Sequence, residues 1–151
     1  MEVVCADVGS VKRGNFGWFA GLSDGTERKG SDIRNFADFV AELLNEGNRV
    51  ALGFEAPMYV PFRDDVFTLT SKRRGETNPN WIGGPGGSVL ATGLTQVPWV
   101  LLSVKGKLRR PARAVLNWAG FQSGSAELFL WEAFVRERLK EVVTSKTQKS
   151  Q

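Results

Sequence analysis

Residues 2–22, which read EVVCADVGSVKRGNFGWFAGL, are the stretch that decides the fold. Residues 3–8 are a short apolar run rich in β-branched side chains, and residues 16–22 form a second run after Gly14. Two such runs, separated by a polar turn with glycine, predict the two strands of a β-hairpin. Asp7 is the one charged residue within the first run, and it lies near the carboxyl end of that strand.

The chain beyond the hairpin predicts further strands and helices. Apolar residues recur at helical spacing in some segments, while others are short and continuously apolar, as in a strand covered on both faces. In chain order, the expected elements are a strand at 26–29, a helix capped by Ser31 or Asp32 and ended by Gly47, a strand at 50–55, a mostly buried helix at 88–103 with a kink at Pro98, a short helix from Pro111, a strand at 128–131 and a helix at 134–143. This order predicts a mixed α/β sheet with flanking helices.

Residues 56–87 interrupt the pattern, because they are rich in proline and glycine. So long an irregular stretch in a compact domain indicates either a functional loop or a disordered one. The glycine run at 83–87 is not a phosphate-binding loop of the Walker type, because no Lys-Ser or Lys-Thr follows it. Trp81, beside this run, either stacks on a base or packs under the loop.

The amino-acid composition limits the catalytic mechanisms that this protein can use. The 151 residues include no histidine and one cysteine, Cys5, with 42% hydrophobic residues. This describes one globular domain, which we expect over residues 1–143, followed by a flexible tail at 144–151. The lack of histidine excludes Ser-His-Asp and Cys-His mechanisms, and one thiol cannot form an internal disulfide. Any catalysis must therefore use carboxylates, amines, hydroxyls or the backbone.

Charge is unevenly distributed along the chain, whose formal net charge is +4. Residues 77–126 contain no carboxylate, and their basic residues are Lys105, Lys107, Arg109, Arg110 and Arg113. Either these side chains share a face that attracts polyanions, or they form a solvated basic loop. The longest strongly apolar stretch, near residues 97–104, is far shorter than the roughly 20 residues of a membrane span, so we expect a cytoplasmic protein with no membrane partner.

Four motifs carry a resemblance to a known superfamily. They are DVGSVKRGNFGW at residues 7–18, GFEAPM at 53–58, GPGGSVLATG at 84–93 and LWEAF at 130–134. Together with the element order, they resemble ribonuclease H-like proteins, and more specifically an uncharacterised bacterial family of predicted nucleases, with the Holliday-junction-resolvase-like branch as a neighbour. The resemblance spans most of residues 3–135.

The resemblance implies a ribonuclease H-like mixed sheet with strand order 3-2-1-4-5, in which the first, fourth and fifth strands are parallel neighbours. Asp7, Glu55 and Glu132 then occupy acidic motif positions at the carboxyl ends of those strands. Neighbouring strands lie about 4.8 Å apart, so the three carboxylates can share one cluster. Two Mg²⁺ or Mn²⁺ ions would relieve their repulsion and could hold a phosphodiester.

Each acid also has an ordinary structural interpretation. Asp7 can accept hydrogen bonds from the turn at 9–12, and Glu55 can form a salt bridge with Arg63 or Arg73. Glu132 can cap the last helix, because acids stabilise a helix N-terminus. Proteins of the superfamily usually continue into a last helix that carries a further acid. This chain departs from that pattern, which indicates a sequence that is truncated, divergent or inactive. Glu137 and Glu141 either replace that acid or lie on the surface.

Basic residues near the acids are candidates for binding the phosphates of a nucleic acid. Two of them lie in the turn after Asp7, and the others lie on the long loop after Glu55. They are Lys12, Arg13, Arg63, Lys72, Arg73 and Arg74. Contacts of this kind carry no base specificity. An ordinary polar turn explains Lys12 and Arg13 equally well.

Three functions remain open from the sequence. The first is a metal-dependent nuclease that hydrolyses phosphodiesters of DNA or RNA. The second is a nucleotide-binding phosphotransferase module of the actin and sugar-kinase type, whose Asp-x-Gly-Ser turn matches residues 7–10 although the chain supplies only one of the two domains needed. The third is a non-catalytic nucleic-acid-binding domain of the same fold.

Overall fold

The computed structural model describes residues 1–73, 81–82 and 84–133. These residues form a mixed α/β fold with a six-stranded sheet in the order β3-β2-β1-β4-β6-β5 and three helices. The strands are β1 (Glu2–Asp7), β2 (Gly17–Gly21), β3 (Glu27–Gly30), β4 (Val50–Phe54), β5 (Ala114–Val115) and β6 (Leu128–Glu132). The helices are α1 (Ile33–Asn45), α2 (Gly84–Lys107) and α3 (Trp118–Gln122).

The predicted hairpin is confirmed: β1 pairs antiparallel with β2, and β2 pairs antiparallel with β3. On its other side β1 pairs parallel with β4, which in turn pairs parallel with β6. The predicted fifth strand is thus β6, and it takes its predicted place beside β4. The observed order differs from 3-2-1-4-5 because the two-residue strand β5 adds to the outer edge of β6.

Helix α1 begins and ends at the predicted residues. Asp32 is its N-cap, and the carboxylate of this residue accepts hydrogen bonds from the amides of Arg34 and Asn35 at 2.7 and 3.1 Å. These contacts satisfy amides that have no partner within the helix. At the other end Gly47 has a φ of 88°, a left-handed conformation that favours glycine and turns the chain toward β4.

Helix α2 is longer and more exposed than predicted. Pro98 lies inside it, and among its described side chains Val100 and Val104 are the buried hydrophobic ones, whereas Leu94 and Leu102 are 58% and 68% exposed. The expectation of a mostly buried helix is therefore wrong, because only one side of α2 packs on the body of the protein. Among the described residues, this helix is the one long and apolar enough to span a membrane, over Gly86–Lys107. That is weak evidence, since helices of soluble proteins meet the same criteria.

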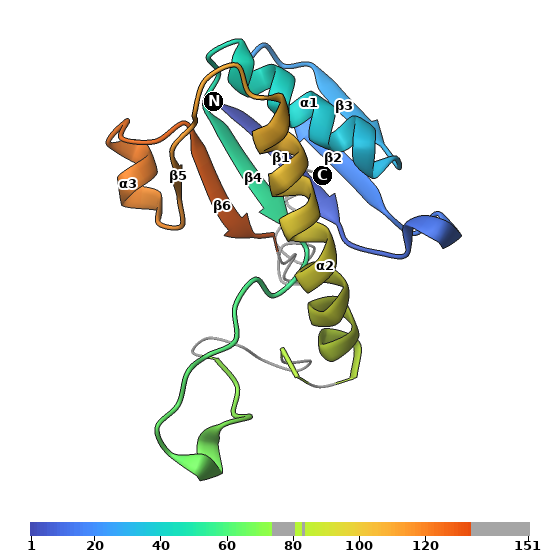
Figure 1. Ribbon diagram of the computed structural model, residues 1–151, viewed down its shortest axis with the longest axis vertical. Coiled ribbons are helices and arrows are strands. Elements are labelled where there is room, and N and C mark those ends of the chain that lie inside the picture. Colours follow the sequence, from blue (N-terminus) through green and yellow to red (C-terminus); the bar gives the residue numbers. More distant parts are fainter. Residues whose placement is uncertain (74–80, 83, 134–151) are drawn as a thin grey trace, which may run out of the picture.

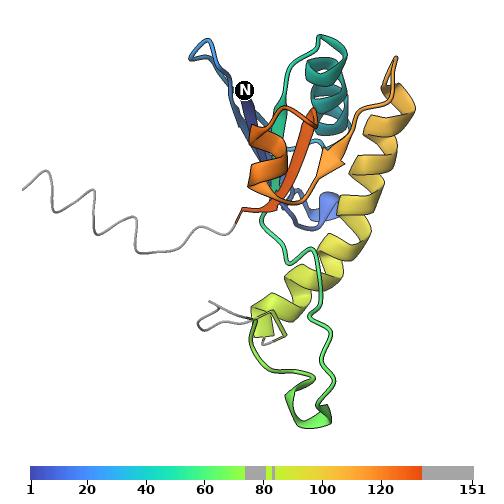
Figure 2. The same ribbon diagram turned by 90° about the vertical axis from the view of Figure 1, so that its left-hand side faces the viewer.

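The hydrophobic core lies between one face of the sheet and helices α1 and α2, which lie side by side over it (Figures 1 and 2). Phe36 of α1 is fully buried and contacts the rings of Phe16, Trp18 and Phe54. On the opposite face, α3 packs Phe121 against Phe129 of β6. The sheet therefore has a thick helical layer on one side and the short helix α3 on the other.

The predicted short helix from Pro111 is wrong. Instead, residues 114–115 form β5, and the amides of Glu127 and Leu128 donate to the carbonyl of Arg113. The helix begins later, after Asn117, whose side chain accepts from the amide of Gly120 at 2.6 Å. The edge of β6 offers ladder hydrogen bonds that a helix at Pro111 would forgo. The predicted helix at 134–143 and the tail at 144–151 lie outside the described residues.

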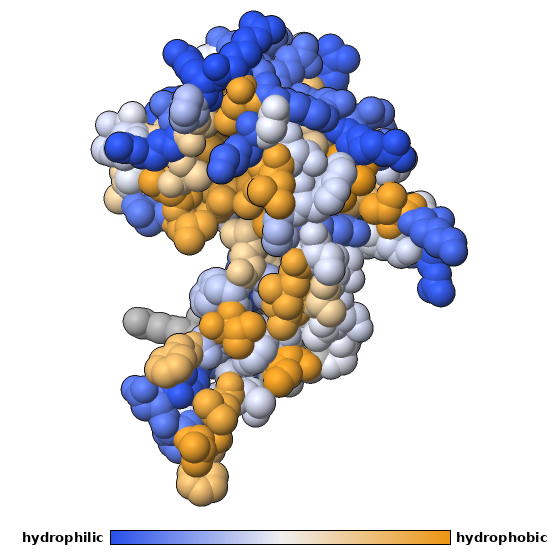
Figure 3. Space-filling model, in the orientation of Figure 1, coloured by the Kyte–Doolittle hydropathy of each residue, from blue (hydrophilic) through white to orange (hydrophobic). Residues whose placement is uncertain are grey.

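Residues 58–73, which we call the arm, extend from the carboxyl end of β4 beyond the edge of the sheet, together with the first half of α2 (Figure 1). The arm contains a short 3-10 turn at Val66–Thr68, capped by Asp65. It exposes large apolar side chains, among them Phe62 at 91% and Phe67 at 93%. Figure 3 shows hydrophobic side chains gathered on this projecting part of the molecule.

Candidate carboxylate site

Two of the three predicted acids lie side by side at the carboxyl ends of β1 and β4. Ala6 is paired with Phe54, and the amide of Glu55 donates to the carbonyl of Ala6 at 2.8 Å. This bond continues the parallel ladder by one residue, so Asp7 and Glu55 hold matching positions on neighbouring strands. Both side chains are exposed.

Glu132 is out of register with this pair. Its partner on β4 is Phe54, whose ring packs in the core on the helical face of the sheet. Side chains of paired residues on neighbouring strands point to the same face, and successive residues alternate. The backbone therefore places Glu132 on the helical face and Asp7 and Glu55 on the opposite one. The structure brings together Asp7 and Glu55 but does not bring Glu132 to them.

The contacts of Glu132 agree with this separation. Its Oε1 accepts hydrogen bonds from the amide of Met58 at 2.7 Å and from Nη1 of Arg73 at 2.8 Å. The second contact is an ion pair whose arginine is 7% exposed. Arg73, predicted to contact phosphate, is thus shielded from solvent and paired with a predicted metal ligand.

The environment of Glu55 favours its protonated form. Partial burial raises the pKa of this carboxyl above 4.5, and the neighbouring charge of Asp7 raises it further. Two carboxylates that close repel each other unless a proton or a cation lies between them. A proton or a cation is therefore stabilised between the carboxyl groups of Asp7 and Glu55.

These two acids fit a hard divalent cation by the chemistry of their donor atoms. Carboxylate oxygens are ligands that Mg²⁺ and Mn²⁺ take in proteins, and a cation would relieve the repulsion between Asp7 and Glu55. A group of three or more metal-ligating side chains does not occur within residues 1–73, 81–82 and 84–133. The donor set in this part of the chain thus consists of two carboxylates.

Basic side chains lie on two segments that leave the carboxyl ends of β1 and β4, the loop after Asp7 and the arm. Lys12 and Arg13 lie in a 3-10 turn at Val11–Arg13 and are exposed. Gly9 precedes this turn, and a Cβ atom at Gly9 would lie 2.1 Å from the carbonyl oxygen of Asn15, so a side chain there would force the loop after Asp7 apart. On the arm, Nη2 of Arg63 donates to the carbonyl of Lys72 at 2.9 Å, and Lys72 is exposed. Arg74 lies outside the described residues, as do Glu137 and Glu141.

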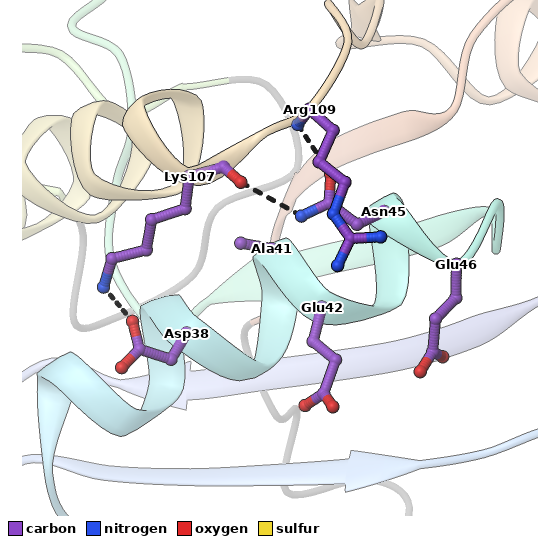
Figure 4. Close-up of a pocket in the computed structure, with 7 residues that line it drawn as sticks. All are labelled: Asp38, Ala41, Glu42, Asn45, Glu46, Lys107 and Arg109. Carbon is purple, nitrogen blue, oxygen red and sulfur yellow. Dashed lines mark hydrogen bonds and ion pairs between the residues drawn. The ribbon is translucent and has the colours of Figure 1, made fainter.

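The basic stretch at 105–113 lies elsewhere. Helix α2 carries it to the opposite end of the sheet from Asp7, where acidic residues of α1 approach it (Figure 1). Lys107 forms an ion pair with Asp38, and its carbonyl accepts a hydrogen bond from Asn45 at 3.0 Å. These residues line a shallow pocket of about 300 Å³ with mixed charge (Figure 4). The stretch is therefore partly neutralised and does not share an edge with the carboxylate pair.

Sequence reasoning missed two hydrogen bonds at the end of the sheet where Asp7 and Glu55 lie. Nε2 of Gln96 on α2 donates to the carbonyl of Gly9 at 2.5 Å, which ties the helix to the loop after Asp7. The amide of Met58 donates to Glu132. Neither contact was predictable, because a glutamine on a helix and a backbone amide carry no distinctive sequence signal, even though Met58 ends the motif GFEAPM. Trp81 packs in the interior at 6% exposure, and its Nε1 donates to the carbonyl of Ser71.

Comparisons with models of protein families, with curated proteins and with solved structures gave no match to this chain. No family assignment follows from them, and the function is argued from the carboxylate pair and its surroundings.

Proposed function

We propose that this protein is a metal-dependent nuclease that hydrolyses phosphodiesters of DNA or RNA, with a ribonuclease H-like fold and a cytoplasmic location. The observation that carries the proposal is the pair Asp7 and Glu55, exposed at matching ends of adjacent parallel strands, with the pKa of Glu55 raised. The order β3-β2-β1-β4-β6 supports the fold assignment, since it has the expected five strands in the expected sequence.

In this proposal, Asp7 and Glu55 hold Mg²⁺ or Mn²⁺ with their carboxylate oxygens. A bound cation would stabilise negative charge on the phosphate oxygens and lower the pKa of attacking water. Lys12 and Arg13 lie in the turn after Asp7, and as exposed cations they would bind the neighbouring phosphates of the nucleic acid. Lys72 on the arm would contact further phosphates of the same nucleic acid.

The test is cleavage of single-stranded, duplex and branched DNA and RNA with Mn²⁺, with Mg²⁺ and with EDTA. We expect cutting that needs the cation and that falls at least about 100-fold in Asp7→Asn and Glu55→Gln, because removing even an indirect partner of a metal commonly costs 10- to 100-fold. Asp24→Asn, in the exposed turn between β2 and β3, is the matched control and should cut like the wild type.

Cutting that persists in EDTA, or that Asp7→Asn leaves unchanged, would contradict the proposal. The pairing of Glu132 with Arg73 favours one alternative, a non-catalytic nucleic-acid-binding domain of the same fold, since it leaves two carboxylates rather than three at the described site. Binding with a steep salt dependence but without turnover would support that alternative.

A further inference from the structure

One carboxylate oxygen joins both ends of the arm to the sheet. Oε1 of Glu132, the last residue of β6, accepts from the amide of Met58 at the start of the arm and from Arg73 at its end. The side chain of Glu132 is 17% exposed and that of Arg73 is 7% exposed. We call the contacts of Glu132 with Met58 and Arg73 the latch.

Arg73 also contacts the start of the arm itself. Its guanidinium carbon lies 4.6 Å from the ring centroid of Tyr59, and its Nη1 lies 3.4 Å from the carbonyl oxygen of the same residue. Replacing Glu132 removes the acceptor that Met58 and Arg73 share, and replacing Arg73 removes the guanidinium that pairs with a carboxylate only 17% exposed. Loss of either partner of a shielded ion pair is unfavourable. The base of the arm is therefore expected to open when either Glu132 or Arg73 is replaced.

The latch does not hold Glu55 in place. The amide of Glu55 donates to the carbonyl of Ala6, and on the other side the amide of Ala133 donates to the carbonyl of Phe54. These sheet hydrogen bonds fix the backbone at the carboxylate without help from the arm. The latch acts on the arm, whose basic residues Arg63 and Lys72 are joined by a hydrogen bond.

We infer that Glu132 and Arg73 are positioning residues that hold the arm, with its basic residues Arg63 and Lys72, at the carboxyl end of β6, and that Glu132 is not a metal ligand. The inference rests on the proposed function in taking the phosphates of a nucleic acid as the ligand of Arg63 and Lys72. Loss of the latch then weakens substrate binding more than turnover, and leaves cation binding by Asp7 and Glu55 unchanged.

The first experiment measures hydrogen exchange in the full chain by mass spectrometry. In Glu132→Gln, which preserves size and one acceptor, amides at the base of the arm, Met58 among them, should exchange about tenfold faster or more, while those of α1 stay unchanged. Glu127→Gln is the matched control directly before the other end of β6, where Glu127 accepts from the amide of Arg113. In this control, amides at the base of the arm should exchange at the wild-type rate.

Arg73→Lys is the second variant and keeps the charge while it loses the guanidinium geometry. Its exchange at the base of the arm should lie between those of the wild type and Glu132→Gln. If Glu132→Gln does not fold, Arg73→Lys supplies the same readout. Exchange at the base of the arm that stays at the wild-type rate in every folded variant would overturn the latch.

The second experiment separates positioning from metal ligation. We expect Glu132→Gln to bind Mn²⁺ within about twofold of the wild type in calorimetry, and Glu55→Gln to bind it at least about tenfold more weakly. With a nucleic-acid substrate, Glu132→Gln should raise KM about fivefold or more and leave kcat nearly unchanged, as expected for lost binding that is uniform between ground and transition states.

A loss of Mn²⁺ affinity in Glu132→Gln as large as that in Glu55→Gln would make Glu132 a ligand and overturn the inference. A fall in kcat with an unchanged KM would overturn it as well. Faster exchange in Glu132→Gln from a wild type that neither cuts nor binds nucleic acid would support the latch and refute the nuclease, so the two failures are distinct.

Discussion

At the scale of single residues, Asp7 and Glu55 lie together at a cost in electrostatic energy. Partial burial and the charge of Asp7 both raise the pKa of Glu55, so the folded protein holds a proton on this carboxyl more tightly than the unfolded chain does. A group of this kind contributes stability below the unfolded pKa near 4.5, and this contribution is lost as the pH rises through the folded value. Glu55 therefore weakly destabilises the fold at neutral pH.

The pKa of Glu55 is accordingly expected to fall toward 4.5 in Asp7→Asn, without reaching it, because burial is the larger cause and remains. A carbon NMR titration of the glutamate carboxyls measures this change. Glu55→Gln should raise the melting temperature slightly at pH 7 and not at pH 3, with a stabilisation below about 1 kcal/mol since the side chain is partly screened by solvent. Asp24→Asn is the control, and a Glu55 pKa that Asp7→Asn leaves unchanged would show that the two charges do not interact.

At the scale of elements, Phe36 is the fully buried aromatic side chain with which α1 packs against the sheet. Phe36 is completely buried, with ring centroids 5.8 Å from Phe16 and 6.2 Å from Phe54. Phe67 on the arm is 93% exposed. The chain thus offers the same residue type in two opposite environments.

Phe36→Ala should lower the free energy of unfolding by about 3–5 kcal/mol, because it removes buried apolar surface and leaves a cavity. Phe67→Ala should change it by less than about 0.5 kcal/mol. Denaturation by urea, followed by circular dichroism, gives both values. Similar losses in the two variants would mean that the arm packs against the body in solution.

At the scale of the whole molecule, two sets of basic residues lie at opposite ends of the sheet in the described part of the chain. At one end Lys12 and Arg13 are exposed in the turn after β1. At the other end Lys107 pairs with Asp38, and the amide of Arg113 donates to Glu127. A nucleic acid bound at the carboxylate pair would contact the first set and not the second.

The salt dependence of nucleic-acid binding should therefore show which of the two sets of basic residues contacts the nucleic acid. Replacing Lys12 and Arg13 together by alanine is expected to reduce the slope of log K against log salt concentration by about 2 on duplex DNA, since each phosphate contact contributes about 0.9. Replacing Lys107 and Arg109 by alanine should leave the slope unchanged. Fluorescence anisotropy between low and moderate salt measures it, and the reverse result would move the binding surface to the other end of the sheet.

Most elements were predictable from local sequence. The hairpin, the cap at Asp32, the turn at Gly47 and the strands β4 and β6 each depend on a few neighbouring residues, whose periodicity, capping groups and glycines act locally. The element near Pro111 was not predictable, because β5 forms through pairing with β6, a contact between segments far apart in the sequence. The exposure of α2 likewise depends on which elements pack against it.

The chain sequence by itself determined that an acid ends β1, that another directly follows β4, and that basic residues occur soon after each of them in the chain. It could not determine the face on which each acid lies. Strands β4 and β6 are apolar on both faces, so their composition does not reveal the phase of the side-chain alternation, and a shift of one residue reverses the face. Only the tertiary register decided that Asp7 and Glu55 lie together while Glu132 faces the helices and binds Arg73, because that register is set by hydrogen bonds between distant strands.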